Sequence, residues 1–219
     1  MQTTDPVLVP TPAGDARITY APAEGPPKAL LALGHGAGGG IEALDLQALA
    51  VALPPLGITV ALVEQPWRVA GRRLAPAPKT LDAGWLPVAE VLAGHGLPLV
   101  AGGRSAGARV ACRTGARSGA VGVLALAFPL HPPGRPERSR ADELLQCGLP
   151  ALVVQSVADP FGGPAEFPEL PADQRLVSIP YGSHGFRVPK RAPVGQDEVL
   201  ESVTDAVGGW VLGLVARPA

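Results

Sequence analysis

The sequence is short of aromatic residues and of net charge. Aromatic residues make up 4% of the 219 positions, too few for the rows of exposed rings that stack on nucleic-acid bases. The formal net charge is -1, so no general excess of basic residues indicates binding to nucleic acid or to an anionic membrane. We therefore expect a small-molecule partner, with no nucleic acid and no membrane.

Cysteine and long apolar runs are scarce as well. The two cysteines, Cys112 and Cys147, do not form a Cys-x-x-Cys pair, which argues against a zinc site or a redox motif. No apolar run reaches the roughly 18–20 residues of a membrane span, and the first twenty residues do not resemble a secretory signal. The expectation is a cytoplasmic protein, a monomer or a homodimer, with no metal and no cofactor.

Apolar residues, by contrast, are plentiful. They make up 47% of the chain against 17% charged residues, enough for a substantial core, and the length fits one domain over residues 1–219. Strands are expected at residues 7–9, 16–20, 28–33, 58–63, 97–101, 121–127, 151–155 and 176–179. Helices are expected at residues 41–53, 81–93, 105–115, 138–147 and 196–215.

The order of these elements predicts the fold class. After an opening hairpin, strands alternate with helices from residue 28 onward. The strands are continuously apolar, as strands are when both faces of their sheet are covered. Right-handed crossovers between them give an α/β fold with a mostly parallel, doubly wound sheet flanked by helices.

One turn in this pattern carries a chemical signature. Residues 103–107 read Gly-Arg-Ser-Ala-Gly, after an apolar strand and before a helix, which is the context of a nucleophile elbow. In such a turn Ser105 sits in a strained conformation that raises its hydroxyl above the sheet edge. Strand and helix approach closely there, which explains Gly103 and Gly107. We predict Ser105 as a nucleophile.

A serine needs a base and an orienting acid, and the expected chain order is Ser, Asp, His. His184 follows the strand ending near residue 179, and Asp159 follows the strand at 151–155. We predict His184 as the base and Asp159 as its orienting acid. The alternatives, His131 in a proline-rich loop and Asp173 in a proline-flanked loop, fit strand ends less well.

A glycine-rich loop at residues 34–40 follows the third strand. Such a loop lets backbone amides converge on one point, as an oxyanion hole requires. We predict the N–H groups of Ala106 and Ala37 as the oxyanion donors. His35 and Gly36 of the same loop are further candidates for the substrate site, and hydrogen bonds of His35 are expected to support the loop.

Residues 64–80 are expected to be irregular and carry several basic side chains. Trp67 and Arg72 in this segment are candidates for binding an anionic substrate, and the alternative is a solvated, mobile loop. His131 is a candidate for the pocket wall. Arg104, beside Ser105, either lines the pocket or pairs with a structural acid.

Four segments together resemble one known family. Residues 33–39, 102–109, 128–137 and 156–162 resemble the small α/β-hydrolases related to dienelactone hydrolase, whose animal branch includes testis-expressed and histone-acetyltransferase-complex hydrolase-like proteins. The resemblance covers roughly residues 28–215. It implies an α/β-hydrolase fold without a large lid, and it places the catalytic triad at Ser105, Asp159 and His184.

The resulting expectation is a serine hydrolase that cleaves an ester or thioester of a small molecule through an acyl-enzyme. One alternative is an interaction or scaffold protein that keeps the fold without catalysis. Another is a dinucleotide-binding protein, because Gly34-x-Gly36-x-x-Gly39 follows a strand and Glu64 ends the next one.

Overall fold

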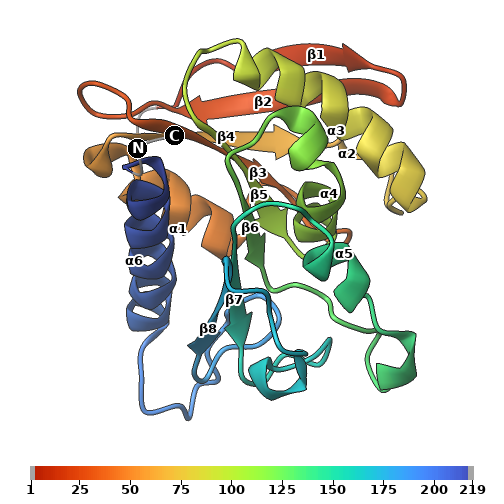
Figure 1. Cartoon of the computed structure of the whole chain (residues 1–219), viewed down its shortest axis with the longest axis vertical. Helices are drawn as coiled ribbons and strands as arrows, with labels where there is room; N and C mark the ends of the chain where they lie inside the picture. The colour runs from red at the N-terminus through yellow and green to blue at the C-terminus, as the bar shows by residue number, and fades with distance from the viewer. Residues whose placement is uncertain (1–2, 217–219) are drawn as a thin grey trace.

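A computed structural model, which describes residues 3–216, contains an eight-stranded sheet (Figure 1). Its strands are β1 (Val7–Thr11), β2 (Gly14–Ala21), β3 (Ala29–Gly34), β4 (Ile58–Glu64), β5 (Leu99–Arg104), β6 (Gly122–Leu126), β7 (Ala151–Ser156) and β8 (Gln174–Ile179). Their spatial order is β1-β2-β4-β3-β5-β6-β7-β8. The first two strands form an antiparallel hairpin, and β3 to β8 all run parallel.

Helices cover both faces of this sheet (Figure 1). They are α1 (Leu44–Ala52), α2 (Pro66–Val69), α3 (Pro78–Ala93), α4 (Ala106–Thr114), α5 (Ala141–Leu145) and α6 (Gln196–Val215). Helices α1 and α6 pack together on one face, whereas α3 and α4 lie on the other. The mostly parallel, doubly wound sheet predicted from the sequence is confirmed, and no large lid is inserted in residues 3–216.

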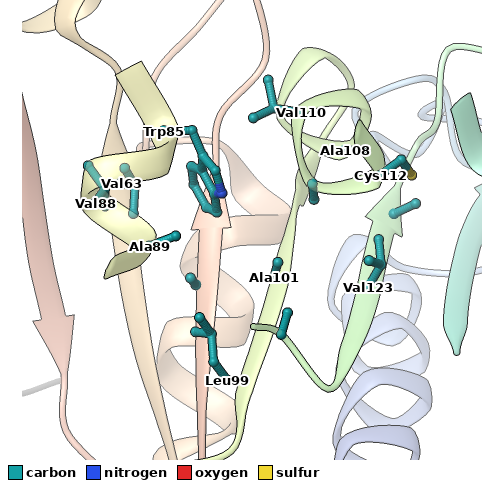
Figure 2. Close-up of a cluster of buried hydrophobic side chains, with 14 of the residues drawn as sticks. Val63, Trp85, Val88, Ala89, Leu99, Ala101, Ala108, Val110, Cys112 and Val123 are labelled. Carbon is teal, nitrogen blue, oxygen red and sulfur yellow. The ribbon is translucent and has the colours of Figure 1, made fainter. Parts of the chain in front are cut away.

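The continuous apolar pattern of the strands follows from this double cover. In β3, Leu30 and Ala32 belong to the core cluster beneath α3 and α4, whereas Leu31 and Leu33 belong to the cluster beneath α1 and α6. Figure 2 shows the first cluster, where Trp85 of α3 lies over the strands. Because alternate residues of a strand face opposite sides, a polar residue on either side would be buried.

Helix α6 shows the complementary pattern. Val199, Val203, Val207 and Val211 recur at four-residue spacing, and all four are buried in the cluster shared with α1. The opposite side of the helix is polar and exposed. This one-sided apolar stripe is what a surface helix needs to pack on a sheet. In the described part of the chain, no helix has the length and apolarity needed to cross a membrane.

Three local predictions differ from the structure. The segment 64–80 is not wholly irregular, because α2 lies within it and α3 already begins at Pro78, whose fixed φ suits the first helical turn. The expected helix at 138–147 is reduced to α5, since Pro136 starts a separate 3-10 turn and the backbone at Arg140 is not helical. Strand β5 runs on to Arg104, where Gly102 and Gly103 still pair with both neighbouring strands.

A close backbone contact joins the ends of β3 and β5 to the first turn of α4. A Cβ atom on Gly103 would lie 2.5 Å from the Gly34 carbonyl oxygen and 2.8 Å from the Gly107 carbonyl carbon. A Cβ atom on Gly107 would overlap the Gly34 carbonyl group even more severely. The sterically required glycines predicted at 103 and 107 are therefore confirmed.

Replacing Gly107 with alanine is expected to lower the free energy of unfolding by about 3 kcal/mol, because the methyl group forces the backbones of β3 and α4 apart. Urea denaturation monitored by circular dichroism measures this change. The matched control is Gly209→Ala, at an exposed position of α6 with open space around it. This control should raise the stability by up to about 1 kcal/mol, the helix propensity difference. Equal stability of Gly107→Ala and the parent would contradict the tight contact.

Candidate active site

Ser105 occupies the turn between β5 and α4. The strand ends at Arg104 and the helix begins at Ala106, so Ser105 alone changes the direction of the chain. Its φ of 51° and ψ of -112° are rare for a residue with a side chain and store about 1–3 kcal/mol of strain. Its N–H donates to the Leu126 carbonyl oxygen at 2.9 Å. The strained turn lies at the carboxyl edge of the parallel sheet, where sites of such folds gather.

Three loops bring the predicted catalytic residues together at this edge. His184 lies in the loop after β8, and its Nε2 is 2.9 Å from the Ser105 Oγ. Its Nδ1 is 2.8 Å from Oδ2 of Asp159, which follows β7. A carboxylate that faces Nδ1 keeps the ring proton on that nitrogen, so Nε2 is left to accept the serine proton.

Asp159 is fully buried and has two further donors. The Gln155 Nε2 donates to Oδ2 at 3.0 Å, and the Phe161 N–H donates to Oδ1 at 2.8 Å. The Phe161 ring also packs against the His184 imidazole, with 4.3 Å between ring centroids. Sequence reasoning missed Gln155, although two buried polar residues, Gln155 and Ser156, at the end of the apolar strand β7 are a signal for such a role.

The alternative acid and base lie elsewhere. Asp173 is exposed and precedes β8, so it lies at the amino edge of the sheet, opposite Ser105. His131 is buried, with Nδ1 2.9 Å from the Pro132 carbonyl oxygen and Nε2 3.0 Å from Glu166. The Pro132 carbonyl and the Glu166 carboxylate raise the pKa of His131, and they occupy both of its ring nitrogens.

A pocket of about 690 Å³ opens above Ser105. Both predicted oxyanion residues, Ala37 and Ala106, line it beside Ser105 and His184. Within residues 3–216 the Ala37 N–H makes no hydrogen bond. The N–H of Ala106, at the first position of α4, lacks a partner within its helix. Among the described residues, neither N–H group thus has a backbone partner, as the donors of an oxyanion hole require.

His35 supports the glycine-rich loop from behind. Its Nδ1 donates to the Gly36 carbonyl oxygen at 2.9 Å, and its Nε2 accepts the Gln65 N–H at 3.1 Å. Burial lowers the pKa of His35, which suits this neutral arrangement. Trp67 packs against the ring, with centroids 5.4 Å apart. The residues that line the large pocket do not include His35, Gly36 or Trp67.

The basic side chains of the pocket differ from those that the sequence singled out. Arg72 is exposed and, like His131, is absent from the pocket lining. Four other arginines line the pocket: Arg104, Arg109, Arg140 and Arg187. Arg104 is the one that sequence reasoning had considered; it lines the pocket and also pairs with Asp45, so both of its expected roles hold.

Within residues 3–216, two of the four arginines have acidic partners and two do not. Arg109 binds the Glu143 carboxylate through two nitrogens, at 2.5 and 2.7 Å. Arg140 donates to the Pro129 carbonyl oxygen at 3.1 Å, and burial, together with the charge of Arg109, lowers its pKa. Among the described residues, no carboxylate lies within 4 Å of a side-chain nitrogen of Arg140 or Arg187.

Comparison with known proteins identifies the fold family. The family described as "Alpha/beta hydrolase domain" matches residues 27–212. The chain belongs to this family. No curated protein matches this hydrolase.

Solved structures of α/β-hydrolases share its fold. A serine hydrolase without lid from Xanthomonas campestris is 21% identical with a TM-score of 0.70, covering 96% of this chain and 95% of that one. Est1E from Butyrivibrio proteoclasticus is 15% identical, with a TM-score of 0.72 and coverages of 98% and 100%. Dienelactone hydrolase from Anabaena variabilis is 16% identical, with a TM-score of 0.68 and 97% of both chains covered. The chain is thus an α/β-hydrolase by family, and it shares its fold with a dienelactone hydrolase, in line with the resemblance.

The hydrogen bond from Gln155 to Asp159 can be tested by substitution. Gln155→Leu removes the amide that fixes Asp159, so we expect kcat/KM for an ester to fall by about tenfold or more. Gln174→Leu is the matched control, because Gln174 is also buried but donates to the Leu144 carbonyl oxygen, away from the site. Each substitution should cost about 1–3 kcal/mol of stability, measured by urea denaturation. Equal losses of kcat/KM in the two variants would contradict a role for Gln155 in the site.

Proposed function

We propose that this α/β-hydrolase hydrolyses esters or thioesters of small molecules through an acyl-enzyme on Ser105. The observation that carries the proposal is the unbroken hydrogen-bond path from the Ser105 Oγ through His184 to the buried Asp159, at the floor of a pocket. In this path the base accepts the serine proton and the carboxylate stabilises the imidazolium that forms. Ser105 is thereby activated as a nucleophile.

The proposed reaction has two steps. The Ser105 Oγ forms a bond to the carbonyl carbon of the substrate, and its proton passes to the His184 Nε2. The carbonyl oxygen takes up the electron pair of its π bond and is held by the N–H groups of Ala37 and Ala106. When the tetrahedral intermediate collapses, the bond to the alcohol or thiol breaks and His184 returns its proton to that leaving group.

Water completes the cycle. It adds to the acyl carbon while His184 removes one of its protons. The second tetrahedral intermediate then collapses, the acid leaves, and Ser105 regains a proton from His184. No metal or cofactor takes part in the proposed sequence.

The strained backbone at Ser105 favours this proposal over a scaffold that only keeps the fold. A positive φ at a serine costs folding energy, and such strain persists mainly at functional sites. The dinucleotide-binding alternative gains little support. Glu64, the expected ribose ligand, is held by Arg17 in a two-bond ion pair, and α1 begins at Leu44 rather than directly after Gly39.

The charge of the pocket suggests the kind of ester. Arg104 and Arg109 are neutralised by Asp45 and Glu143. Arg140 and Arg187 have no such partner within the described residues, and Glu42, the other acid of the lining, pairs with Arg68. Two positive charges therefore remain at the pocket wall. A carboxylate or another anionic group on the acyl or leaving part of the substrate would complement them.

Ser105→Ala is expected to abolish both the hydrolysis of a short p-nitrophenyl ester and labelling by a fluorophosphonate probe, because no other group on the path can form the acyl-enzyme. Release of p-nitrophenol and gel fluorescence are the measurements. Ser202→Ala, at an exposed position of α6, serves as the control and should leave both unchanged. Parental hydrolysis by Ser105→Ala would refute the mechanism, and a folded parent that neither labels nor hydrolyses esters would favour the scaffold.

Substrate charge can be tested with two arginine variants. Arg140→Gln should lower kcat/KM for a carboxylate-bearing p-nitrophenyl ester by about tenfold relative to a neutral ester of equal size, through loss of one charge-assisted contact. Arg72→Gln removes the same charge from an exposed position outside the pocket and should change neither rate. Parallel effects of the two variants on both esters would contradict an anion site at Arg140.

A further inference from the structure

Arg104 connects three parts of the site. It is the last residue of β5 and directly precedes Ser105. Its Nε donates to the Asp45 Oδ2 of α1 at 3.0 Å, and its Nη2 donates to the backbone carbonyl oxygen of His184 at 2.8 Å. Both side chains of the ion pair are largely buried, with 14% of Arg104 and 1% of Asp45 exposed. The guanidinium group therefore joins the nucleophile strand to the loop of the histidine.

The loop around His184 needs such an anchor. Tyr181 and Phe186, on either side of His184, both adopt positive φ values, 62° and 54°. Neither is glycine, so both positions are strained, and strain of this kind persists only where surrounding contacts hold it. Inside the loop the Phe186 N–H donates to the Ser183 carbonyl oxygen at 2.9 Å. Ser156 and Gln196 donate to the Gly182 and Phe186 carbonyl oxygens on either side of His184. Asp159 orients only the imidazole, whereas the bond from Arg104 reaches the backbone of His184 itself.

The geometry of a guanidinium group makes this anchor directional. Nε and Nη2 lie on one edge of a rigid plane, so the position of Asp45 sets the direction in which Nη2 points. The glycines at 36 and 185 give the group room, because a Cβ atom on Gly36 would lie 3.0 Å from Nη1 and one on Gly185 would lie 3.4 Å from Nη2. Nε and Nη2 both bind acceptors of the protein, Asp45 and the His184 carbonyl oxygen, rather than a substrate.

We propose that Arg104 is a positioning residue: held by Asp45, it fixes the backbone of His184 so that the His184 Nε2 stays within hydrogen-bond distance of the Ser105 Oγ. This inference rests on the proposed function, because it assigns Arg104 a role through His184. It also gives Asp45, an acid that no sequence motif marks, a part in the same site.

The test removes the ion pair as a unit, since a single substitution would leave a buried charge unpaired. The double variant Arg104→Met/Asp45→Leu replaces both residues with apolar side chains of similar size. We expect kcat for a neutral p-nitrophenyl ester and the rate of fluorophosphonate labelling to fall about 100-fold, because a displaced base takes up the serine proton poorly in the transition state. KM should stay near the parental value, because the ester is bound as before in the ground state.

Two controls accompany the double variant. Arg17→Met/Glu64→Leu removes the ion pair between β2 and β4, and it should leave kcat unchanged. Arg104→Lys keeps the charge, but an ammonium group lacks the planar fork that reaches Asp45 and His184 together, so it should recover only part of the lost kcat. Thermal unfolding of every variant measures the folded fraction.

Several outcomes would overturn the positioning role. The role is refuted if the double variant keeps the parental kcat. It is also refuted if the loss of kcat is no larger than the loss of folded protein. A raised KM with parental kcat would instead indicate that Arg104 binds substrate. A readout that needs no turnover is the downfield proton resonance of the His184 Nδ1–H bound to Asp159. We expect this resonance to disappear in the double variant. If the resonance persists in the double variant, the positioning role is wrong, whether or not the parent hydrolyses esters. Failure of the positioning role is thereby distinguished from failure of the proposed function.

Discussion

The backbone contact between Gly34, Gly103 and Gly107 is the constraint on which the whole site depends. It holds the end of β3, the end of β5 and the first turn of α4 at distances that leave no space for a methyl group. The loop after β3 therefore begins beside Ser105, which places the Ala37 and Ala106 amides in one pocket with the serine hydroxyl. The strained Ser105 lies in the turn between β5 and α4, two of the elements that this contact holds together.

His184 is supported at two levels. Its ring faces Asp159, whose remaining oxygen is satisfied by the Phe161 amide, and its backbone carbonyl accepts from Arg104. Burial raises the pKa of Asp45, which the positive charge of Arg104 opposes. Buried ion pairs of this kind often contribute no more to stability than apolar side chains of the same size. Such a pair sets the orientation of the guanidinium group, and in this orientation the Arg104 Nη2 donates to the carbonyl oxygen of His184.

The sequence predicted the fold, and it marked three side chains that the structure brings together, because these features have local signatures. Continuously apolar strands, strand-to-helix alternation and a glycine-flanked serine are visible within short windows, and Asp159 and His184 each follow a strand end. The supporting residues have no such signature. Asp45 and Arg104 are 59 positions apart, and an aspartate in the first turn of a helix ordinarily indicates an exposed residue near the helix N-terminus.

The sequence shows which residues are basic, but it does not show whether their side chains face the pocket or the solvent. The segment 64–80 carries several basic residues, yet Arg72 points into solvent and Trp67 packs behind the glycine-rich loop. Arg140 reaches the pocket because the proline-rich chain before α5 folds back, so that the Arg140 N–H donates to the Leu130 carbonyl oxygen at 2.7 Å. A pattern of residue types cannot reveal such a fold-back, since it depends on contacts between segments.

No large lid covers the pocket within residues 3–216, and this has a chemical consequence for the proposed reaction. A covered site excludes solvent and selects which second reactant meets the acyl group. Under the proposed mechanism, an acyl group on Ser105 in an open pocket of about 690 Å³ would be within reach of water and of small alcohols or amines alike. The fate of that acyl group is then set by the concentrations and nucleophilicities of the acceptors, so the same serine would transfer acyl groups to alcohols wherever these compete with water.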